Sequence, residues 1–201
     1  MMTAWQAIVL GIVEGITEFL PISSTGHLIL ASQALGIAQT EFVKSFEIVI
    51  QLGAILAVVV LFWKKLWNLE LDKRVLTAFF PTAVLGLIFY KPVKHYLLGS
   101  TSVVLWSLLI GGIALIVFEW WYKKKTSFIT DPAAVSYQQA ALIGLCQTIA
   151  MVPGVSRSAA TIVGGMLLGM SRSAIVEFSF LLAIPTMAAA TGLDLVKSGW
   201  S

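Results

Sequence analysis

The stretch EGITEFLPISSTGH, residues 14–27, interrupts an apolar segment that extends from Trp5 to Leu35. The segment is long enough for two helices, but the residues from Pro21 to His27 break it midway, because proline lacks a backbone donor and ends a helix. Backbone groups left free by such a break cannot face lipid, so they must line a cavity that the protein encloses. We therefore predict a re-entrant hairpin of two half-helices.

A second segment has the same design. The residues from Tyr137 to Met170 are also apolar, and PGVSRSAAT, residues 153–161, breaks them. Gly11-Ile-Val-Glu14 matches Gly144-Leu-Cys-Gln147 at the same place in each segment. Ile22-Ser23 matches Val155-Ser156 at the same offset, and after each hairpin comes a span that begins with an acid, in Phe46-Glu47 and in Val176-Glu177. Each match alone is weak, but together and in the same order they indicate an internal repeat. The expected single membrane domain, residues 1–201, then divides into repeat one at about residues 1–95 and repeat two at about residues 100–201.

The composition is that of an integral membrane protein. Of 201 residues, 58% are hydrophobic and 11% are charged, and the mean hydropathy is +0.92. The long continuous apolar runs predict membrane helices and exclude an outer-membrane barrel, whose strands would alternate. The 13 basic residues are spread over loops, so we expect no nucleic-acid partner. Four further spans are predicted at Ser45–Trp63, Leu76–Tyr90, Ser102–Tyr122 and Ser173–Val196.

Loop charge gives an expected orientation. Basic residues gather between 64 and 74 and at 123–125, whereas the intervening loop has only Lys91 and Lys94. Cytoplasmic loops carry the excess of Lys and Arg, so the first two loops are placed in the cytoplasm. The first hairpin then enters from outside and the second from inside. We expect an all-α polytopic protein with an inverted repeat, whose two re-entrant breaks meet near the midplane.

Two acidic residues in the first hairpin are candidate metal ligands. Glu14 and Glu18 are four residues apart, which places both carboxylates on one face of a helix. Like charges repel there, so a cation or a shared proton must lie between them. Mg²⁺, or another divalent cation such as Ca²⁺, binds well to one or two carboxylates together with substrate phosphates. Neutralisation by Arg157 without a metal is the alternative.

The polar residues of the first break are candidates for catalysis and anion binding. Ser23, Ser24 and Thr25 stand at a predicted helix start, where free N–H groups and the helix dipole favour an anion. A serine at this place can equally be a plain N-cap. His27 follows them, and an imidazole beside a hydroxyl can act as a general base or as the nucleophile itself.

The second break supplies a cation. Arg157 lies between Ser156 and Ser158, and a guanidinium beside hydroxyls and free amides is suited to bind phosphate. Glu47 and Gln51 are again four residues apart and are expected to point into the same interior. For them, substrate contact and support of the hairpin remain open alternatives.

These motifs resemble one known family. Residues 14–27 and 153–161, together with FEIVIQLGAILAVVVLFW at 46–63 and EFSFLLAIP at 177–185, are similar to the undecaprenyl-pyrophosphate phosphatases of the bacitracin-resistance type. The resemblance covers nearly the whole chain. It implies a multi-pass enzyme of the bacterial plasma (inner) membrane, with a site open to the extracytoplasmic side and a homodimer as one expected assembly. Family members continue with further apolar helices, which this chain is expected to lack.

The resemblance also implies roles. The enzyme would remove the terminal phosphate from undecaprenyl diphosphate and so regenerate the lipid carrier for cell-wall synthesis. Ser24 is the first candidate for the nucleophile with His27 as base, and direct attack by His27 is the second. Glu14 and Glu18 would carry the metal. The diphosphate would be bound by Arg157 with Ser156, Ser158, Ser23, Thr25, Thr161 and Gln51.

A transporter or flippase for an anionic or lipid-phosphate substrate is the competing hypothesis. Inverted repeats with broken helices that meet at the midplane are how many secondary transporters are built. A hydroxyl and His27 beside paired acids favour a hydrolase, since a carrier has little use for a nucleophile with a base.

Overall fold

The structure is a computed structural model that describes residues 2–93, 97, 100–122 and 128–198. The regular elements that it describes are helices, as predicted. In chain order they are α1 (Ala4–Thr17), α2 (Ser24–Ala34), α3 (Glu41–Leu61), η1 (Lys65–Trp67), α4 (Leu69–Pro92), α5 (Thr101–Tyr122), η3 (Pro132–Ala134), α6 (Tyr137–Gln147), η4 (Thr148–Met151), α7 (Arg157–Leu167) and α8 (Arg172–Ser198).

The four predicted spans correspond to α3, α4, α5 and α8, and each of these helices is long and apolar enough to cross a membrane. The chain is a multi-pass membrane protein. Its fourth helix begins earlier than predicted, at Leu69 rather than Leu76. The reason is a cap: the Asn68 side chain accepts a hydrogen bond from the Leu71 N–H at 3.2 Å, which allows a polar first turn to join the apolar span.

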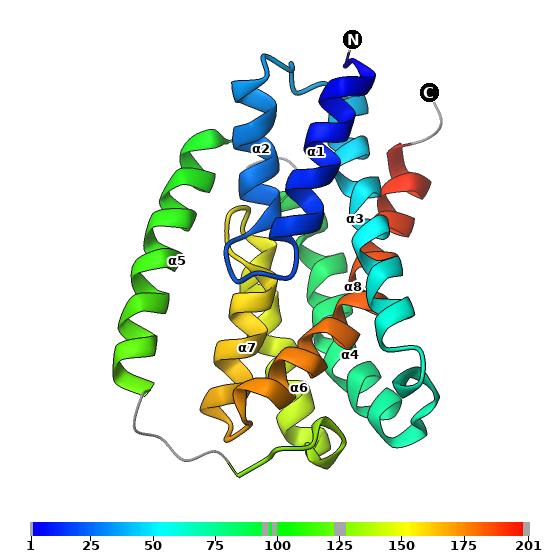
Figure 1. Cartoon of the computed structure of the whole chain (residues 1–201), viewed down its shortest axis with the longest axis vertical. Coiled ribbons are helices and arrows are strands. Elements are labelled where there is room, and N and C mark those ends of the chain that lie inside the picture. The colour runs from blue at the N-terminus through cyan, green and yellow to red at the C-terminus, as the bar shows by residue number, and fades with distance from the viewer. Residues whose placement is uncertain (1, 94–96, 98–99, 123–127, 199–201) are drawn as a thin grey trace.

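The two predicted hairpins are confirmed as pairs of short helices, because α1 packs on α2 and α6 packs on α7. They enter the bundle from opposite ends, and their breaks lie about midway along it (Figure 1). The first break ends sooner than predicted. Ser23 caps α2 by accepting a hydrogen bond from the Gly26 N–H, so Ser24 to His27 form the first turn of this helix rather than a loop.

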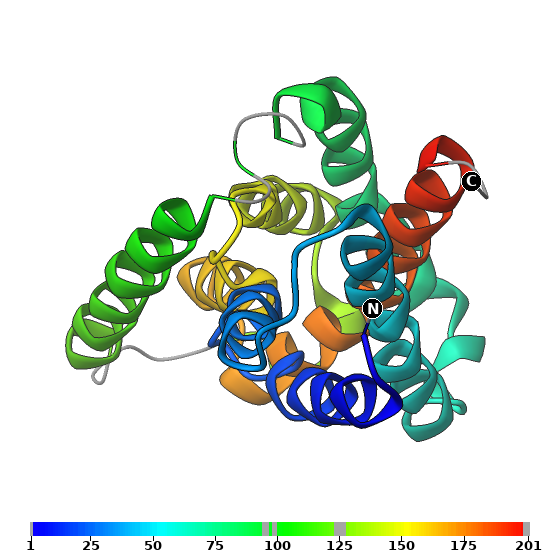
Figure 2. The same cartoon turned by 90° about the horizontal axis from the view of Figure 1, so that it is seen from above.

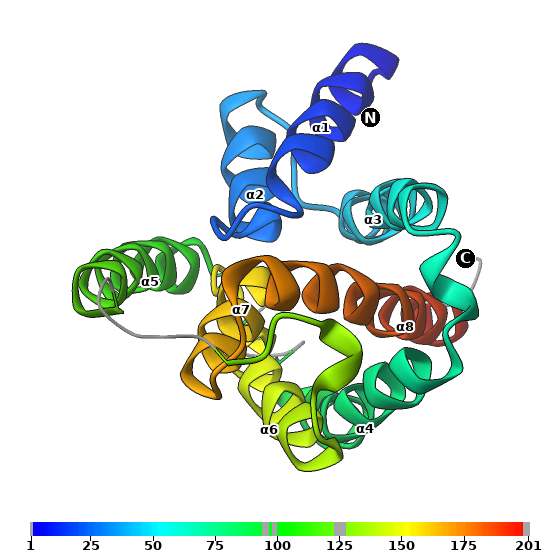
Figure 3. The same ribbon diagram turned by 60° about the horizontal axis from the view of Figure 1, so that its bottom comes forward.

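Three apolar cores of described residues hold the helices together, one of them around Ile55 and Ala183 between α3 and α8. The largest core is shared by α4, α6, α7 and α8 and includes Ala78, Ile143, Met166 and Phe178. Figure 3 shows these four helices grouped together. A smaller core joins α1, α2 and α3 around Leu28. Since α3 also packs on α8, the two groups form one bundle.

Helix α5 stands to one side of the bundle, as the view from above shows (Figure 2). Its ends are tied down by two polar contacts. Gln33 of α2 donates to Thr101 Oγ1 at 2.7 Å, and the Tyr122 hydroxyl donates to the Met166 carbonyl of α7 at 2.8 Å. Most of the α5 surface is apolar and exposed, as a face against lipid would be.

The basic loop at one end of the bundle follows α3. Lys65 in η1 pairs with Glu177 of α8 at 2.5 Å, and Arg74 pairs with Glu70 at 2.7 Å. The orientation prediction also used Lys94 and Lys123–Lys125, which lie outside the described residues. The inverted repeat and the orientation therefore stay predictions, although the opposite entry of the hairpins agrees with both.

Candidate active site

The breaks of the two hairpins touch each other. The Ser158 hydroxyl of α7 donates to the Leu20 carbonyl in the first break at 2.9 Å. Arg157 Nη2, in the same turn of α7, donates to Glu18 Oε1 at 2.9 Å. Leu20 and Glu18 both follow the end of α1. The contact that the sequence predicted between the two broken segments is thus made by backbone and side chains alike.

Glu18 is the centre of the contact. Its Oε1 accepts from Arg157, and its Oε2 accepts a hydrogen bond from the Ser24 hydroxyl. The residue is only 6% exposed, so this ion pair is little screened by solvent. A carboxylate that receives the hydroxyl proton of Ser24 in a hydrogen bond is placed to accept that proton outright.

Arg157 is held rigidly from two sides. Nη1 donates to the Ser179 carbonyl of α8 at 3.0 Å while Nη2 binds Glu18. Its Nε is buried and has no hydrogen-bond partner among the described residues. The Ser179 hydroxyl is bonded in turn to Thr161 Oγ1 at 2.6 Å. A buried guanidinium donor without a partner is an open position for an anion.

Glu14 is a buried acidic residue near Glu18 and Arg157. It is 1% exposed, and neither carboxylate oxygen has a hydrogen bond among the described residues. Its charge interacts with those of Glu18 and Arg157. A buried ionised carboxylate is unfavourable unless a cation or a proton neutralises it, so the two orphaned oxygens fit a divalent cation. Within the described residues no three His, Cys, Asp or Glu side chains come together, and the remaining ligands would have to be substrate phosphates.

The first break is strained at Ser23. This residue has φ 65° and ψ 95° and is the one described residue other than glycine with a positive φ. Such a conformation persists only where the surroundings enforce it. Here the Ser23 side chain caps α2, and its carbonyl is bonded to His27 Nδ1 at 2.8 Å. With Nδ1 engaged in this way, His27 supports the shape of the break.

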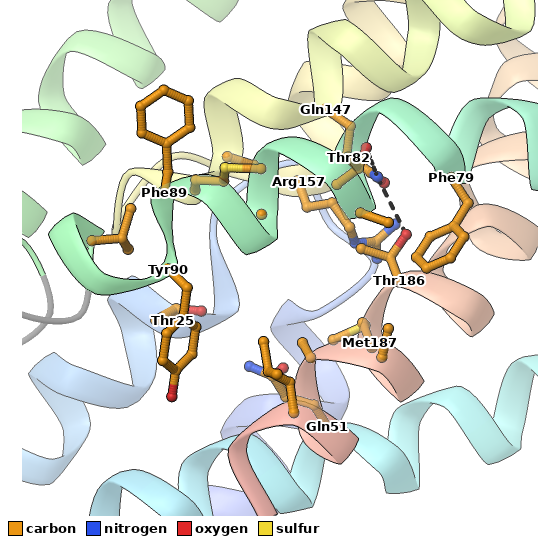
Figure 4. Close-up of a pocket in the computed structure, with 18 of the residues that line it drawn as sticks. Thr25, Gln51, Phe79, Thr82, Phe89, Tyr90, Gln147, Arg157, Thr186 and Met187 are labelled. Atoms are coloured by element: carbon orange, nitrogen blue, oxygen red, sulfur yellow. Dashed lines mark hydrogen bonds between the residues drawn. The ribbon is translucent and has the colours of Figure 1, made fainter. Parts of the chain in front are cut away.

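A cavity of about 750 Å³ opens beside these residues. Figure 4 shows Arg157, Thr25, Gln51, Tyr90 and Met187 on its wall. Most of the wall is apolar and comes from α4 and α8. The predicted site residues on the wall are Glu18, Ser23, Ser24, Thr25, Gln51, Ser156 and Arg157.

The other predicted residues lie behind this wall. Ser158 and Thr161 are buried in the contacts of α7 described above, and Glu14 is buried in the last turn of α1, four residues before Glu18. Glu47 accepts hydrogen bonds from Ser32 at 2.7 Å and Gln39 at 3.2 Å. It therefore binds the end of the first hairpin, which is the supporting role left open for it.

Sequence reasoning missed three wall residues that form a polar cluster, Thr82 of α4, Gln147 of α6 and Thr186 of α8. The Gln147 amide donates to both threonine hydroxyls, at 2.8 and 3.2 Å. A signal was present. Gln147 takes the place of Glu14 in the repeat, and each threonine follows a proline inside its helix, Pro81 or Pro185.

Comparisons with known proteins agree on one family. Residues 7–200 match the family model described as "Bacitracin resistance protein BacA". The chain is 57% identical to an undecaprenyl-diphosphatase of Aquifex aeolicus over 100% of its own length and 78% of that protein. It is 52% identical to one of Wolinella succinogenes, over 98% of this chain and 77% of the relative.

Proposed function

The chain belongs to the family of the bacitracin resistance protein BacA, and from this premise we propose that it is a membrane phosphatase. It hydrolyses undecaprenyl diphosphate to undecaprenyl phosphate and inorganic phosphate, the reaction that its relatives' name describes. The reaction recycles the lipid carrier of cell-wall synthesis. Bacitracin resistance follows from the same activity.

One observation carries the proposal: a single carboxylate, Glu18, joins a hydroxyl to a guanidinium at the polar end of an apolar cavity. The diphosphate group suits the end with Arg157, since guanidinium donors match phosphate oxygens. The prenyl chain suits the wall beyond it, where Leu87, Phe89 and Met187 lie. A lipid with an anionic head group has this division of polarity.

Ser24 is the proposed nucleophile. Its Oγ bonds to the terminal phosphorus, the bond from that phosphorus to the bridging oxygen breaks, and the bridging oxygen leaves with the lipid phosphate. The hydroxyl proton passes to Glu18, its hydrogen-bond partner. Water then attacks the phosphoserine, the bond from phosphorus to Oγ breaks, and Glu18 returns the proton to Oγ. The protons of the water leave with the phosphate or pass to solvent.

This assignment changes one role given by the sequence. Ser24 was expected to use His27 as its base, but the hydroxyl is bonded to Glu18, and the His27 ring is bonded to the Ser23 carbonyl. We therefore propose Glu18 as the proton acceptor and His27 as a positioning residue. Arg157 binds the charge that develops on the phosphoryl oxygens.

We further propose that Glu14 and Glu18 hold Mg²⁺ or another divalent cation together with the diphosphate. The ion would neutralise phosphate charge and polarise the phosphoryl oxygens. What supports it is the pair of buried Glu14 oxygens without partners.

The site is proposed to open outside the bacterial plasma membrane. The cavity extends from the two breaks to the C-terminal ends of α4 and α8, where Tyr90, Val93 and Val196 line it. These ends lie opposite η1 and its basic residues (Figure 1). If the basic loop is cytoplasmic, as the positive-inside rule indicates, the cavity opens to the extracytoplasmic side.

The test is phosphate release from a prenyl diphosphate in detergent micelles, with Mg²⁺ or with EDTA. We expect turnover that requires the metal and falls by at least about a hundredfold in Arg157→Ala. Arg172→Ala is the matched control, because that arginine pairs with Glu119 at the surface, away from the cavity. A folded protein that binds the lipid diphosphate without releasing phosphate would overturn the proposal and favour a carrier.

A further inference from the structure

The Gln147 side chain is locked in one orientation. Thr82 donates its hydroxyl proton to the Gly144 carbonyl at 2.9 Å, and Thr186 donates its own to the Leu182 carbonyl at 2.7 Å. Both hydroxyl oxygens can therefore only accept from Gln147, so the amide nitrogen must face them. The amide oxygen is left pointing elsewhere and cannot exchange places with the nitrogen.

That amide oxygen is an unused acceptor. Gln147 is 2% exposed, and its Oε1 has no hydrogen-bond partner among the described residues. An unpaired buried acceptor is unfavourable, and Gln147 is part of the cavity wall. A ligand in the cavity that donates a hydrogen bond would remove this penalty.

Gln147 and Arg157 line the same cavity, and both are linked to α8. Arg157 Nη1 binds the Ser179 carbonyl and Thr186 binds the Leu182 carbonyl. Three residues of helix separate these carbonyls, which corresponds to about 5 Å along α8. Figure 4 shows Arg157 beside the linked Thr82, Gln147 and Thr186. One donor, Arg157 Nε, and one acceptor, Gln147 Oε1, are thus buried without partners among the described residues, and both belong to side chains that line one cavity.

We propose that Gln147 Oε1 accepts a hydrogen bond from the protonated oxygen of a phosphate bound at Arg157. The subsite made by Gln147, Thr82 and Thr186 is therefore selective for an oxyanion that carries a proton. The positive charge of Arg157 attracts the anion, and Gln147 accepts a hydrogen bond from its protonated oxygen. This inference rests on the proposed function, in which the released inorganic phosphate is such an ion.

A neutral amide suits this task better than a second carboxylate. At the matching position of the first repeat stands Glu14, whose negative charge would repel a phosphate unless a cation intervened. Gln147 offers an oxygen acceptor of similar reach without that repulsion. Its two threonine contacts fix the oxygen, so a ligand does not have to order it on binding.

A comparison of phosphate with sulfate separates the effect of the ion's charge from the effect of its proton. In mildly alkaline buffer both ions carry two negative charges, but only phosphate carries a proton. The experiment measures the dissociation constant of each ion from the rise in unfolding temperature of the detergent-solubilised chain, which needs no turnover. The proteins compared are the unmodified chain, Gln147→Leu, and Gln33→Leu as the control, since Gln33 lies on the surface, where its side chain donates to Thr101.

For the unmodified chain and Gln33→Leu we expect phosphate to bind about five to ten times more tightly than sulfate, the effect of one hydrogen bond. In Gln147→Leu the two ions should bind equally. Equal binding of both ions by the unmodified chain overturns the inference even if Gln147→Leu does not fold. A preference for phosphate that persists in Gln147→Leu overturns it too. Loss of prenyl diphosphate hydrolysis with the preference intact would count against the proposed function instead.

Discussion

Glu18 Oε1 and Arg157 Nη2 lie 2.9 Å apart although the two residues are separated by 139 positions in the chain. The pair joins the first break to the start of α7, so it fixes the relative position of the two hairpins. Ser24 donates a hydrogen bond to the other carboxylate oxygen of Glu18. An anion that draws Arg157 toward the cavity would weaken the ion pair and free Glu18 Oε1.

Ser24→Ala should therefore abolish most of the activity. Removal of the nucleophile is expected to slow phosphate release by at least about a hundredfold, because the remaining site can only bind and polarise the substrate. The comparison is with Ser102→Ala, an exposed serine on α5. Near-normal turnover by a folded Ser24→Ala protein would exclude the serine route and direct attention to His27 or to water.

Glu14→Gln should raise stability and lower activity at the same time. The amide carries no charge, so burying it without partners is less unfavourable than burying the carboxylate, and the variant should be more stable by about 1 kcal/mol or more in the absence of metal. The loss of a metal ligand should raise the Mg²⁺ concentration needed for half-maximal phosphate release about tenfold or more.

The measurements are thermal unfolding in EDTA and an Mg²⁺ titration of turnover. Glu119→Gln is the control, because Glu119 pairs with Arg172 at the surface. A Glu14→Gln protein that is less stable in EDTA, with an unchanged Mg²⁺ requirement, would show that Glu14 has another partner.

The sequence was sufficient to predict the spans, the hairpins and the main charged residues, since apolar length and proline breaks are properties of single segments. Which residues face the cavity was harder to predict. Thr161 stands in the same motif as Arg157, yet it turns toward Ser179 and away from the wall. This direction depends on the packing of α7 against α8, which neither segment encodes alone.

The Gln147 cluster shows the same limit. Its three residues come from α4, α6 and α8, and no spacing along the chain relates them. The match of Gln147 to Glu14 indicated a special position, but its partners follow only from the bundle. The hydrogen bond of Ser24 to Glu18 rather than to His27 has a similar cause: the end of α1 and the first turn of α2 face each other across the break.

Gly144→Ala should unfold the bundle or weaken it severely. A Cβ at Gly144 would lie 1.9 Å from the Ala78 carbonyl oxygen of α4, where no flexible side chain can move aside. The helices α4 and α6 would have to separate, and Thr82 would lose its hydrogen bond to the Gly144 carbonyl. We expect the free energy of unfolding to fall by at least about 2 kcal/mol.

Unfolding in detergent by denaturant or heat measures this effect. Gly111→Ala in α5 is the matched control, because a Cβ there meets nothing within 4 Å. An equal change in the two variants would mean that α4 and α6 are not in close contact at Gly144.

Two substitutions of Ser23 separate the effect of its strained backbone from the effect of its cap on α2. Ser23→Ala keeps the positive φ and removes the hydroxyl that caps α2, which should cost about 1 kcal/mol. Ser23→Gly also removes the hydroxyl but adopts a positive φ freely, and glycine at an N-cap is only a few tenths of a kcal/mol worse than serine. The glycine variant should therefore be the more stable of the two by about 1 kcal/mol or more.

Activity is expected to follow the opposite order. A glycine in the break lets the chain leave the one conformation in which Ser24 meets Glu18, so Ser23→Gly should lose turnover even though it unfolds at a higher temperature than Ser23→Ala. Unfolding temperature and kcat measured on the same two preparations give both orders. If Ser23→Ala proved the more stable variant, the positive φ at residue 23 would not be a strained conformation held by the fold.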